Sequence, residues 1–354
     1  MRPLGSAVEV VDHLVAVQAQ DLNNARWALG QRMKRATDTE IERAYDAGEI
    51  LRTHVLRPTW HFVTPADIRW LLALTGPRIH QLGAYYYKQI GMTARKLAAT
   101  DTRIARAVRG TSLTRDELGE QLGLAGTPLA HVVMHAELEG VIASGPRRGK
   151  QITYALLDER APTAVDKPRD QALAELARRY LAGHGPAQLE DLAWWSGLTV
   201  KDARRAIELA AVERFELAGT EYFHIPARAT AIPDPHVRLL PNYDELLIAF
   251  ADRSAARDPR IVAMDETAFF NHFVVSNGRL IGGYRRLVEK RTTVIACTLV
   301  VTPTAAERTA LAAEVERFGA FLGTPIRLDL RIDPTHRARP SMSREARAKR
   351  RAAR

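Results

Sequence analysis

The run ELGEQLGL at residues 117–124 has a diverged copy, DLAWWSGL, at residues 191–198. Each copy starts with an acidic residue and a leucine, and each reaches a glycine, Gly123 in the first and Gly197 in the second. Glycine suits the tight turn of a helix-turn-helix here, because it accepts the left-handed backbone that ends a helix. A second helical pattern follows each glycine. The repeat therefore predicts two helix-turn-helix units of the same kind.

A hairpin pattern follows the helices of each copy. The turn of the first hairpin carries Arg147, Arg148 and Lys150, and the turn of the second contains Gly219. The four predicted strands are residues 141–144, 151–156, 214–217 and 221–225. Helix, helix, helix and hairpin is the order of a winged helix, and the basic turn suits contact with DNA phosphates. A winged helix can equally dock a protein, so both kinds of partner stay open at this point.

The first 80 residues repeat this order and predict a third winged helix. Its predicted elements are helices at residues 7–18, 24–34 and 37–47, strands at 51–55 and 60–63, and a further helix from 64 to 74.

Strand patterns dominate after the proline-rich residues 232–235. Asn277-Gly278 is a strong signal for a two-residue hairpin turn, and residues 305–322 form an amphipathic helical pattern. The predicted strands are residues 237–240, 273–276, 280–284, 291–301 and 326–332. The expected fold class is α+β, with three tandem winged-helix units followed by a small β-barrel-like C-terminal domain. The expected domains are residues 1–80, 81–160, 161–232 and 233–336, with a disordered basic tail at residues 337–354.

The positive charge of the chain is concentrated in that tail. The formal net charge is +10 over 354 residues, and residues 337–354 hold eight Lys or Arg residues against one acid, Glu345. The folded body is thus close to neutral. We expect the tail to stay unfolded, and such a tail can tether the protein to DNA electrostatically.

The single cysteine, Cys297, excludes a disulfide framework and a multi-cysteine metal site. It lies in an apolar run, which predicts a buried thiol. No apolar run reaches membrane-spanning length, and the N-terminus lacks a secretory pattern. We expect a cytoplasmic, nucleoid-associated monomer that acts on double-stranded DNA and needs no metal or cofactor.

The run VQAQD at residues 17–21 follows an apolar helical pattern in which Gln18 continues the stripe of Val11 and Val15. A buried amide that lacks partners costs about 1–3 kcal/mol, so either a partner satisfies Gln18 or a pocket opens beside it. Gln20 follows two residues later. If the chain leaves the helix between them, both amides can point into one site.

Three segments together resemble the AlkZ-like family of bacterial DNA glycosylases. They are LVAVQAQD at residues 14–21, RTHVLRPTWH at 52–61 and LLPNYDE at 239–245. The resemblance implies tandem winged helices plus a small β-barrel, removal of alkylated purines and, in some members, unhooking of interstrand cross-links. It assigns catalysis to Gln18 and Gln20. The chain departs from the family in the short lead, about six residues, before its first apolar helix.

An alkylated purine explains how two amides could suffice for catalysis. Hydrolysis of an ordinary glycosidic bond usually needs a pair of carboxylates. Alkylation of a ring nitrogen makes the base cationic, so the leaving group needs no proton. The remaining task is to position a water, which Gln18 and Gln20 could do without being strong bases. Without the resemblance, two amides that satisfy backbone groups at a helix end would be the favoured interpretation.

Further candidates surround this motif. Asp21 precedes a helical pattern and is expected to cap that helix rather than to act as a base. Arg52 and His54 share one face of a predicted strand, with Arg57 at the turn, and phosphate positioning and a solvated wing are equally compatible with them. His61 could line the cleft or lie on the surface.

Three other features are weaker candidates. Asp244 belongs to the third family-like segment but has no obvious reaction role. Arg285 and Arg286 belong to a basic hairpin that could enter a groove of DNA. The three tyrosines at residues 85–87 could stack on bases, but packing between helices is the favoured interpretation.

Two other classes of function compete with a glycosylase. A transcription regulator would also bind DNA through winged helices, but it would more often have one such unit and a dimerisation element. A scaffold could keep the fold and lack catalysis. The sequence shows no phosphate-binding glycine loop and no nucleophile triad, so other enzyme classes lack support.

Overall fold

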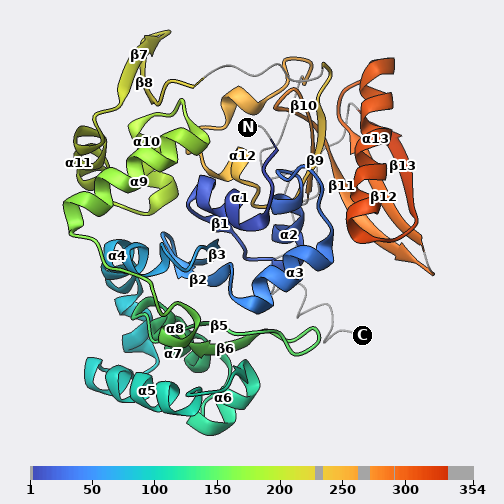
Figure 1. Ribbon diagram of the computed structural model, residues 1–354. Coiled ribbons are helices and arrows are strands. Elements are labelled where there is room, and N and C mark those ends of the chain that lie inside the picture. Colours follow the sequence, from blue (N-terminus) through green and yellow to red (C-terminus); the bar gives the residue numbers. More distant parts are fainter. Residues whose placement is uncertain (1–2, 228–233, 262–271, 291, 334–354) are drawn as a thin grey trace. The chain divides into compact units, whose positions relative to one another are not determined.

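The computed structural model describes residues 3–227, 234–261, 272–290 and 292–333, and it is a mixture of helices and strands (Figure 1). The basic tail at residues 337–354 and Arg291 of the predicted basic hairpin lie outside the described residues. The chain divides into two compact units. Unit 1 comprises Met1–Thr230 and Tyr243–Asp252, and unit 2 comprises Ala231–Asn242 and Arg253–Arg354.

Unit 1 opens with a helix, a short strand, two helices and a hairpin. The elements are α1 (Ala7–Leu14), β1 (Val17–Gln18), α2 (Leu22–Gly30), α3 (Asp38–Ala47), β2 (Leu51–Val55) and β3 (Thr59–Val63). Thr37 and Glu40 form a capping box at the start of α3, and Gly48 ends this helix at φ 82°. The three strands form one antiparallel sheet in the order β1-β3-β2. The predicted hairpin is confirmed.

The first helix is shorter than the sequence pattern predicts. It ends at Leu14, where Val15 turns the chain with φ 68° and ψ −49°. The next residues leave the helix because the backbones of Val17 and Gln18 pair with Phe62 and His61 of β3. Gln18 therefore lies on a strand and not on a helical stripe, and the sheet contact has overridden the helical periodicity.

The repeated runs fold into sets with the same order of elements. The first set contains α5 (Ala94–Ala107), β4 (Leu113–Thr114), α6 (Arg115–Leu122), α7 (Gly126–Leu138), β5 (Ile142–Ser144) and β6 (Thr153–Leu156). The second contains α9 (Arg169–His184), α10 (Leu189–Ser196), α11 (Val200–Ala210), β7 (Glu213–Leu217) and β8 (Thr220–His224). Gly123 and Gly197 end the helices α6 and α10 with φ 68° and 69°, as the repeat predicted. Ala187 bridges to Phe223 of β8, at the place where β4 pairs with β6 in the first set.

A long helix, α4 (Ile68–Gln89), links the N-terminal set to the next one. The sequence predicted that it would end near Leu74, but Pro77 lies inside the helix and does not stop it. The expected domain boundary at residue 80 thus falls within a continuous helix. Tyr87 is buried, and Tyr86, although exposed, stacks on His131 of α7, so the favoured interpretation as helix packing holds for these two; Tyr85 is exposed.

Unit 1 contains a large and a smaller hydrophobic core among its described residues. The larger one joins residues of the N-terminal set, such as Leu51 and Trp70, with Tyr180 and Trp195 of the α9–α11 set. The smaller one lies among α5, α6 and α7 and includes Ile104. The short helix α8 (Leu157–Arg160) follows β6, and α12 (Glu245–Ile248) returns to unit 1 from a distant part of the sequence.

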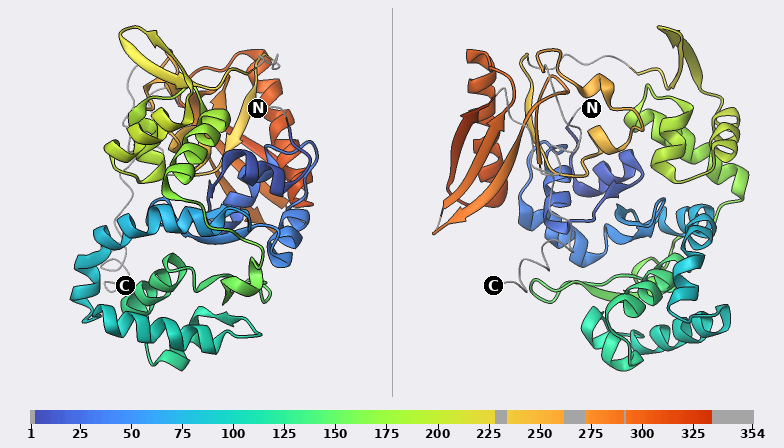
Figure 2. Two further views of the ribbon diagram at one scale, coloured as in Figure 1. Left: turned by 60° about the vertical axis from the view of Figure 1, so that its left-hand side comes forward. Right: turned by 180° about the vertical axis from the view of Figure 1, so that it is seen from behind.

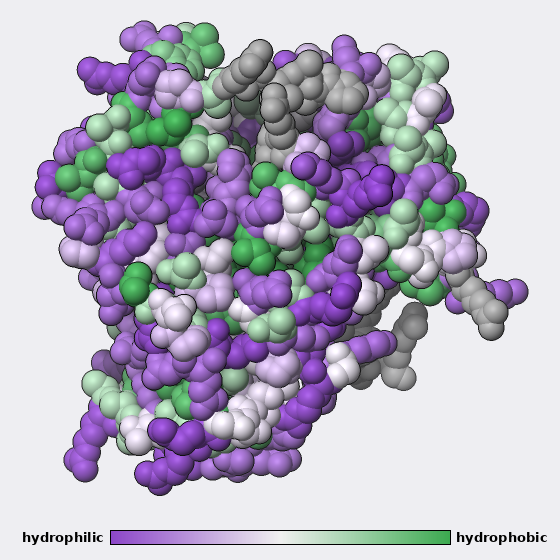
Figure 3. Space-filling model, in the orientation of Figure 1, coloured by the Kyte–Doolittle hydropathy of each residue, from purple (hydrophilic) through white to green (hydrophobic). Residues whose placement is uncertain are grey.

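The β7–β8 hairpin differs from the other two hairpins because its first strand is fully exposed. Both views of Figure 2 show it projecting from the helices α9–α11. Phe215 stacks on Tyr222, and Leu217 is 62% exposed. In the space-filling view this hairpin carries a small hydrophobic spot on a mostly hydrophilic face (Figure 3).

Unit 2 contains a five-stranded sheet in the order β13-β12-β11-β10-β9, with β13 parallel to β12 and the other pairs antiparallel. The elements are β9 (Val237–Leu240), η1 (Ser254–Ala256), β10 (His272–Ser276), β11 (Arg279–Glu289), β12 (Thr292–Leu299), α13 (Ala305–Leu322) and β13 (Ile326–Ile332). Asn277 and Gly278 form the predicted turn with φ 51° and 77°. Cys297 is buried, as predicted.

The barrel-like closure expected of the C-terminal domain is not confirmed. Among the described strands, β9 and β13 are the two edges of a linear order. The strand β11 is longer than expected, so Arg285 and Arg286 lie within it and are exposed. Within the described ranges, none of the helices is long and apolar enough to cross a membrane.

Candidate active site

Gln18 lies where β1 pairs with β3 inside unit 1. Its backbone pairs with His61, and the next residue continues the pairing, because the Ala19 N–H donates to the Trp60 carbonyl oxygen at 2.7 Å. Gln18 is the last residue of β1, and Gln20 lies two residues later at a bend in the chain. The motif thus leaves the helix at a strand, with Gln18 buried and Gln20 exposed.

The side chain of Gln18 is buried and held by an arginine. Gln18 is 7% exposed, and its Oε1 accepts a hydrogen bond from Arg57 Nη2 at 3.0 Å. Arg57 also lies over the ring of Trp194, with its Cζ 5.4 Å from the centroid. Because Arg57 uses the amide oxygen, the orientation of the Gln18 amide is fixed and its NH₂ group is the part that can donate elsewhere.

A buried carboxylate anchors the backbone of Gln18. Glu245, the first residue of α12, is 1% exposed, and its Oε1 accepts the Gln18 N–H at 2.8 Å. Its Oε2 accepts from Trp195 Nε1 at 2.9 Å and lies 3.5 Å from His184 Nε2. Burial by itself raises the pKa of Glu245, but His184 and the Gln18 N–H outweigh it and hold the pKa below its usual range. Glu245 is therefore ionised at neutral pH.

His61 lies beside Gln18 on the neighbouring strand and is completely buried. Its Nδ1 is 3.0 Å from the Thr59 carbonyl oxygen, and its Nε2 has no hydrogen-bond partner among the residues that the structure describes. Burial, reinforced by the charge of Arg57, lowers the pKa of His61 to about 3. The ring is thus neutral, with Nδ1 donating to Thr59 and Nε2 free to accept. His61 therefore does not lie on the surface.

Gln20 and Asp21 lie at the exposed end of the motif. The Oε1 of Gln20 accepts from the Trp60 backbone N–H at 3.5 Å. Asp21 caps α2, because its Oδ1 accepts the Asn24 N–H at 3.2 Å. The predicted capping role is therefore confirmed.

Arg52 and His54 are neither phosphate ligands nor part of a solvated wing, because both are buried. Arg52 Nε donates to the Ala19 carbonyl oxygen at 2.9 Å, and its guanidinium lies 4.3 Å from the ring centroid of Trp60. His54 Nδ1 lies 2.5 Å from a carboxylate oxygen of Glu137 on α7. Both side chains therefore support the hairpin that carries the site, and the expectation for them was wrong.

The basic turn between β5 and β6 is only partly available for DNA. Arg147 binds Asp46 and Glu42 of α3 at 2.9 and 2.5 Å, and Arg148 binds Glu117. Lys150 is exposed at the turn. The free cationic turn expected from the sequence is therefore wrong for the two arginines, because carboxylates within the same unit neutralise them.

Asp244 lies next to Glu245, but its own contacts are with Arg32 and with the start of α12. It is fully buried, binds Arg32 through both oxygens at 2.7 and 2.9 Å, and caps α12 by accepting the Leu246 N–H. Arg285 and Arg286 belong to unit 2 and are exposed on β11. Their predicted contact with a DNA groove stays a prediction.

Three residues of this cluster, Glu245, His184 and Trp195, were not predicted from the sequence. Glu245 lies next to Asp244 in the third family-like segment. Nothing in the sequence pattern indicates that Asp244 caps α12 whereas Glu245 binds the Gln18 N–H. His184 continues the buried face of α9 that includes Tyr180, which is a detectable signal. Trp195 lies in the second repeat run, where the usual interpretation of a tryptophan is core packing.

Chemically, the cluster offers a neutral amide of fixed orientation, a neutral imidazole acceptor and a buried negative charge. Neither His61, which is neutral, nor Glu245, which is ionised, is a strong general acid. Such a site can orient water and stabilise a developing positive charge, but it is poorly suited to protonating a leaving group.

Comparison with known proteins identifies the family of the chain. The model of the AlkZ-like DNA glycosylase family matches residues 11–321. The interstrand DNA cross-link repair glycosylase of Streptomyces sahachiroi is 25% identical over 332 residues, which are 84% of this chain and 85% of the relative. The solved structure of the Streptomyces sahachiroi DNA glycosylase AlkZ aligns with a TM-score of 0.76 and 22% identity, covering 94% of this chain and 95% of that one. The chain therefore belongs to the AlkZ-like family of DNA glycosylases.

Proposed function

We propose that this DNA glycosylase hydrolyses the N-glycosidic bond of cationic N-alkylated purines such as 7-alkylguanine, and that it unhooks interstrand cross-links joined through such bases. The second part is supported by the name of the relative from Streptomyces sahachiroi, an interstrand DNA cross-link repair glycosylase. The first part is supported by the states of His61, which is neutral, and Glu245, which is ionised, because neither readily protonates a leaving group and a cationic base leaves without receiving a proton.

In this proposal the water is held by the glutamine motif. The NH₂ group of Gln18 donates to the water oxygen, since Arg57 already occupies the amide oxygen. Gln20, whose Oε1 accepts from the Trp60 backbone N–H, contributes a second amide from the exposed end of the motif. His61 Nε2 accepts a hydrogen bond from the water, and a weak base suffices because the sugar becomes strongly electrophilic as the base departs.

Glu245 contributes charge rather than proton transfer. Its two oxygens hold the Gln18 N–H and Trp195 Nε1, and the carboxylate is 1% exposed. Its negative charge, in a buried site, stabilises the oxocarbenium-like transition state of glycosidic cleavage. The buried Gln18 amide, fixed by Arg57 beside an ionised Glu245, is the observation that carries the proposal.

The sets of helices and hairpins are proposed to be winged helices that bind double-stranded DNA. The proposal is supported by their common order of elements, a helix, a short strand or bridge, two helices and a hairpin. The tandem arrangement, the division at residues 1–80, 81–160 and 161–232, and a barrel-like C-terminal domain belong to the same proposal. So do a monomeric state and action on DNA in the cytoplasm.

The substrate class can be tested by comparing a cationic with a neutral lesion. Duplexes that carry one 7-methylguanine or one hypoxanthine are mixed with excess protein, and the released base is measured over time. We expect release of 7-methylguanine only, because hypoxanthine would need a general acid. Equal release of both bases would overturn the cationic substrate class. Binding of both duplexes without any release would favour the alternative of a non-enzymatic DNA-binding protein.

A further inference from the structure

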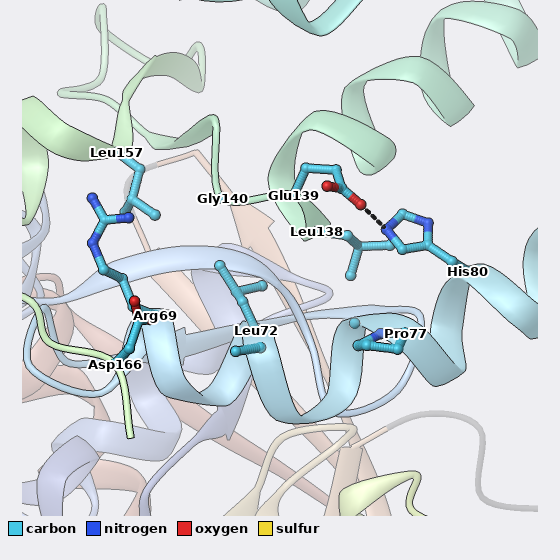
Figure 4. Close-up of a pocket in the computed structure, with 11 residues that line it drawn as sticks. Arg69, Leu72, Pro77, His80, Leu138, Glu139, Gly140, Leu157 and Asp166 are labelled. Atoms are coloured by element: carbon cyan, nitrogen blue, oxygen red, sulfur yellow. Dashed lines mark ion pairs between the residues drawn. The ribbon is translucent and has the colours of Figure 1, made fainter. Parts of the chain in front are cut away.

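A second cluster of polar side chains lies where α4 meets the end of α7. His80 comes from α4, His135 from α7, and Glu139 is the residue that caps α7. Each offers one ligand atom, and the three atoms lie within 4.8 Å of one another. His80 Nε2 is 3.0 Å from Glu139 Oε1, and Figure 4 shows these two side chains pointing toward each other. None of the three belongs to the cluster around Gln18.

The backbone explains why these side chains meet. Gly76 lies one turn before His80, and a Cβ added to it would be 3.3 Å from the Leu138 carbonyl oxygen. The two helices therefore approach closely at Gly76, and the next turn of α4 reaches Glu139. On α7, His135 and Glu139 are four residues apart and share one face of the helix.

Both imidazoles are oriented by a partner at their other nitrogen. His135 Nδ1 is 3.0 Å from a carboxylate oxygen of Asp101 on α5, and both side chains are only 13% exposed. His80 Nδ1 is 3.2 Å from the hydroxyl of Tyr87. Metal-binding histidines usually have such a partner, most often a carboxylate, which fixes the tautomer and leaves the remaining nitrogen for the ion.

We propose that His80, His135 and Glu139 bind a divalent transition-metal ion of the zinc type, with both histidines ligating through Nε2. Ligands around a tetrahedral zinc lie about 2.0–2.2 Å from the ion, so the three atoms can be at most about 4 Å apart, and small side-chain rotations close the set. Two nitrogens and one oxygen favour zinc and its neighbours over Mg²⁺ and Ca²⁺, which prefer oxygen ligands.

The fourth coordination position opens toward a cavity. A cavity of about 410 Å³ is lined by His80 and Glu139 together with apolar residues such as Leu72 and Leu138 (Figure 4). The ion would join α4 to α7 and leave one position for water or a small ligand. This differs from the expectation of a metal-free protein.

Metal binding can be tested on the full chain after treatment with EDTA and its removal. We expect calorimetric titration with ZnCl₂ to show one site with a dissociation constant of about 1 µM or tighter, MgCl₂ to show none, and Co²⁺ to give visible absorption bands. The double variant His80→Ala/His135→Ala should bind zinc at least about 100-fold more weakly. His131→Ala is the matched control, because His131 lies one turn earlier on α7 and stacks on Tyr86, outside the cluster.

A positioning variant separates the proposal from a loss of folding. Asp101→Asn should weaken zinc binding about 10- to 100-fold, because it removes the carboxylate that orients His135. Melting curves in EDTA check that each variant folds, and the half-exposed Glu139→Gln replaces the double variant if that protein melts early. The proposal is overturned if the wild type does not bind zinc, if the folded variants bind it as tightly as the wild type, or if His131→Ala alone abolishes binding.

Discussion

The β2–β3 and β7–β8 hairpins occupy the same place in two sets of elements with the same order, yet one is buried and the other projects into solvent. Every residue of β2 is buried, and every residue of β7 is exposed. Polar residues that look like a DNA-binding wing in the sequence therefore become the support of the site in the first hairpin. The topology is shared, but the role of each arginine depends on what packs over the hairpin.

The largest loss of stability is expected on removal of the Glu245 carboxylate, which binds both Gln18 and Trp195. Glu245→Ala leaves the Gln18 N–H, Trp195 Nε1 and His184 without their acceptor in a buried place. We expect the free energy of unfolding to fall by about 3–5 kcal/mol, measured by urea denaturation. Glu245→Gln, which keeps the shape, should cost less. A change below about 1 kcal/mol in the alanine variant would contradict the anchoring role.

Arg52 and Arg214 allow a matched comparison of the two hairpins, because each is the second residue of the first strand of its hairpin. Arg52→Ala should cost about 2–3 kcal/mol, because it leaves the Ala19 carbonyl oxygen unpaired and removes the contact with Trp60. Arg214→Ala should cost below about 1 kcal/mol, because its side chain is 73% exposed and binds only Glu221 across the hairpin. Equal losses in thermal or urea unfolding would break the distinction between the two hairpins.

His61 should make the buried hairpin sensitive to acid. Its pKa is about 3 in the folded protein and near 6.5 when unfolded, so the unfolded state binds more protons between these values. Its contribution to stability is complete above pH 6.5 and is lost as the pH falls. Between pH 6.5 and 5 the loss should reach about 2 kcal/mol. His61→Gln, compared with the wild type by urea unfolding at both pH values, should remove this slope; an unchanged slope would contradict the buried neutral histidine.

The smallest effect on catalysis is expected from the tail. The arginines of the β5–β6 turn bind carboxylates, so residues 337–354 hold a large share of the positive charge that can meet DNA. Deleting them should weaken duplex binding at low salt and flatten the dependence on salt concentration. The rate of base release at saturating protein should barely change. Loss of that rate would show that the tail helps to form the active complex.

The repeat was the part of the fold that the sequence predicted best. Gly123 and Gly197 mark the ends of two helices because a left-handed backbone is a local requirement, readable without knowing the tertiary contacts. The helix at Ala305–Leu322 and the Asn277-Gly278 turn are local in the same sense, and both were predicted correctly.

The site could be predicted only in part, because its geometry depends on distant contacts. The end of α1 at Leu14 follows from the pairing of β1 with a strand more than forty residues later, which helical periodicity cannot reveal. The bond between the Gln18 N–H and Glu245 spans 227 positions. The motif named Gln18 and Gln20 as candidates, but the sequence did not show that Arg52 and His54 would be buried.

The most direct test of the catalytic assignment is single-turnover release of 7-methylguanine from duplex DNA by Gln18→Ala and Gln20→Ala. Loss of one amide that positions water should raise the barrier by about 1–3 kcal/mol, which is about a 10- to 100-fold slower release, with duplex affinity nearly unchanged. Gln121→Ala, an exposed glutamine on α6, should release the base at the wild-type rate. Wild-type rates in both motif variants would contradict the assignment of catalysis to Gln18 and Gln20.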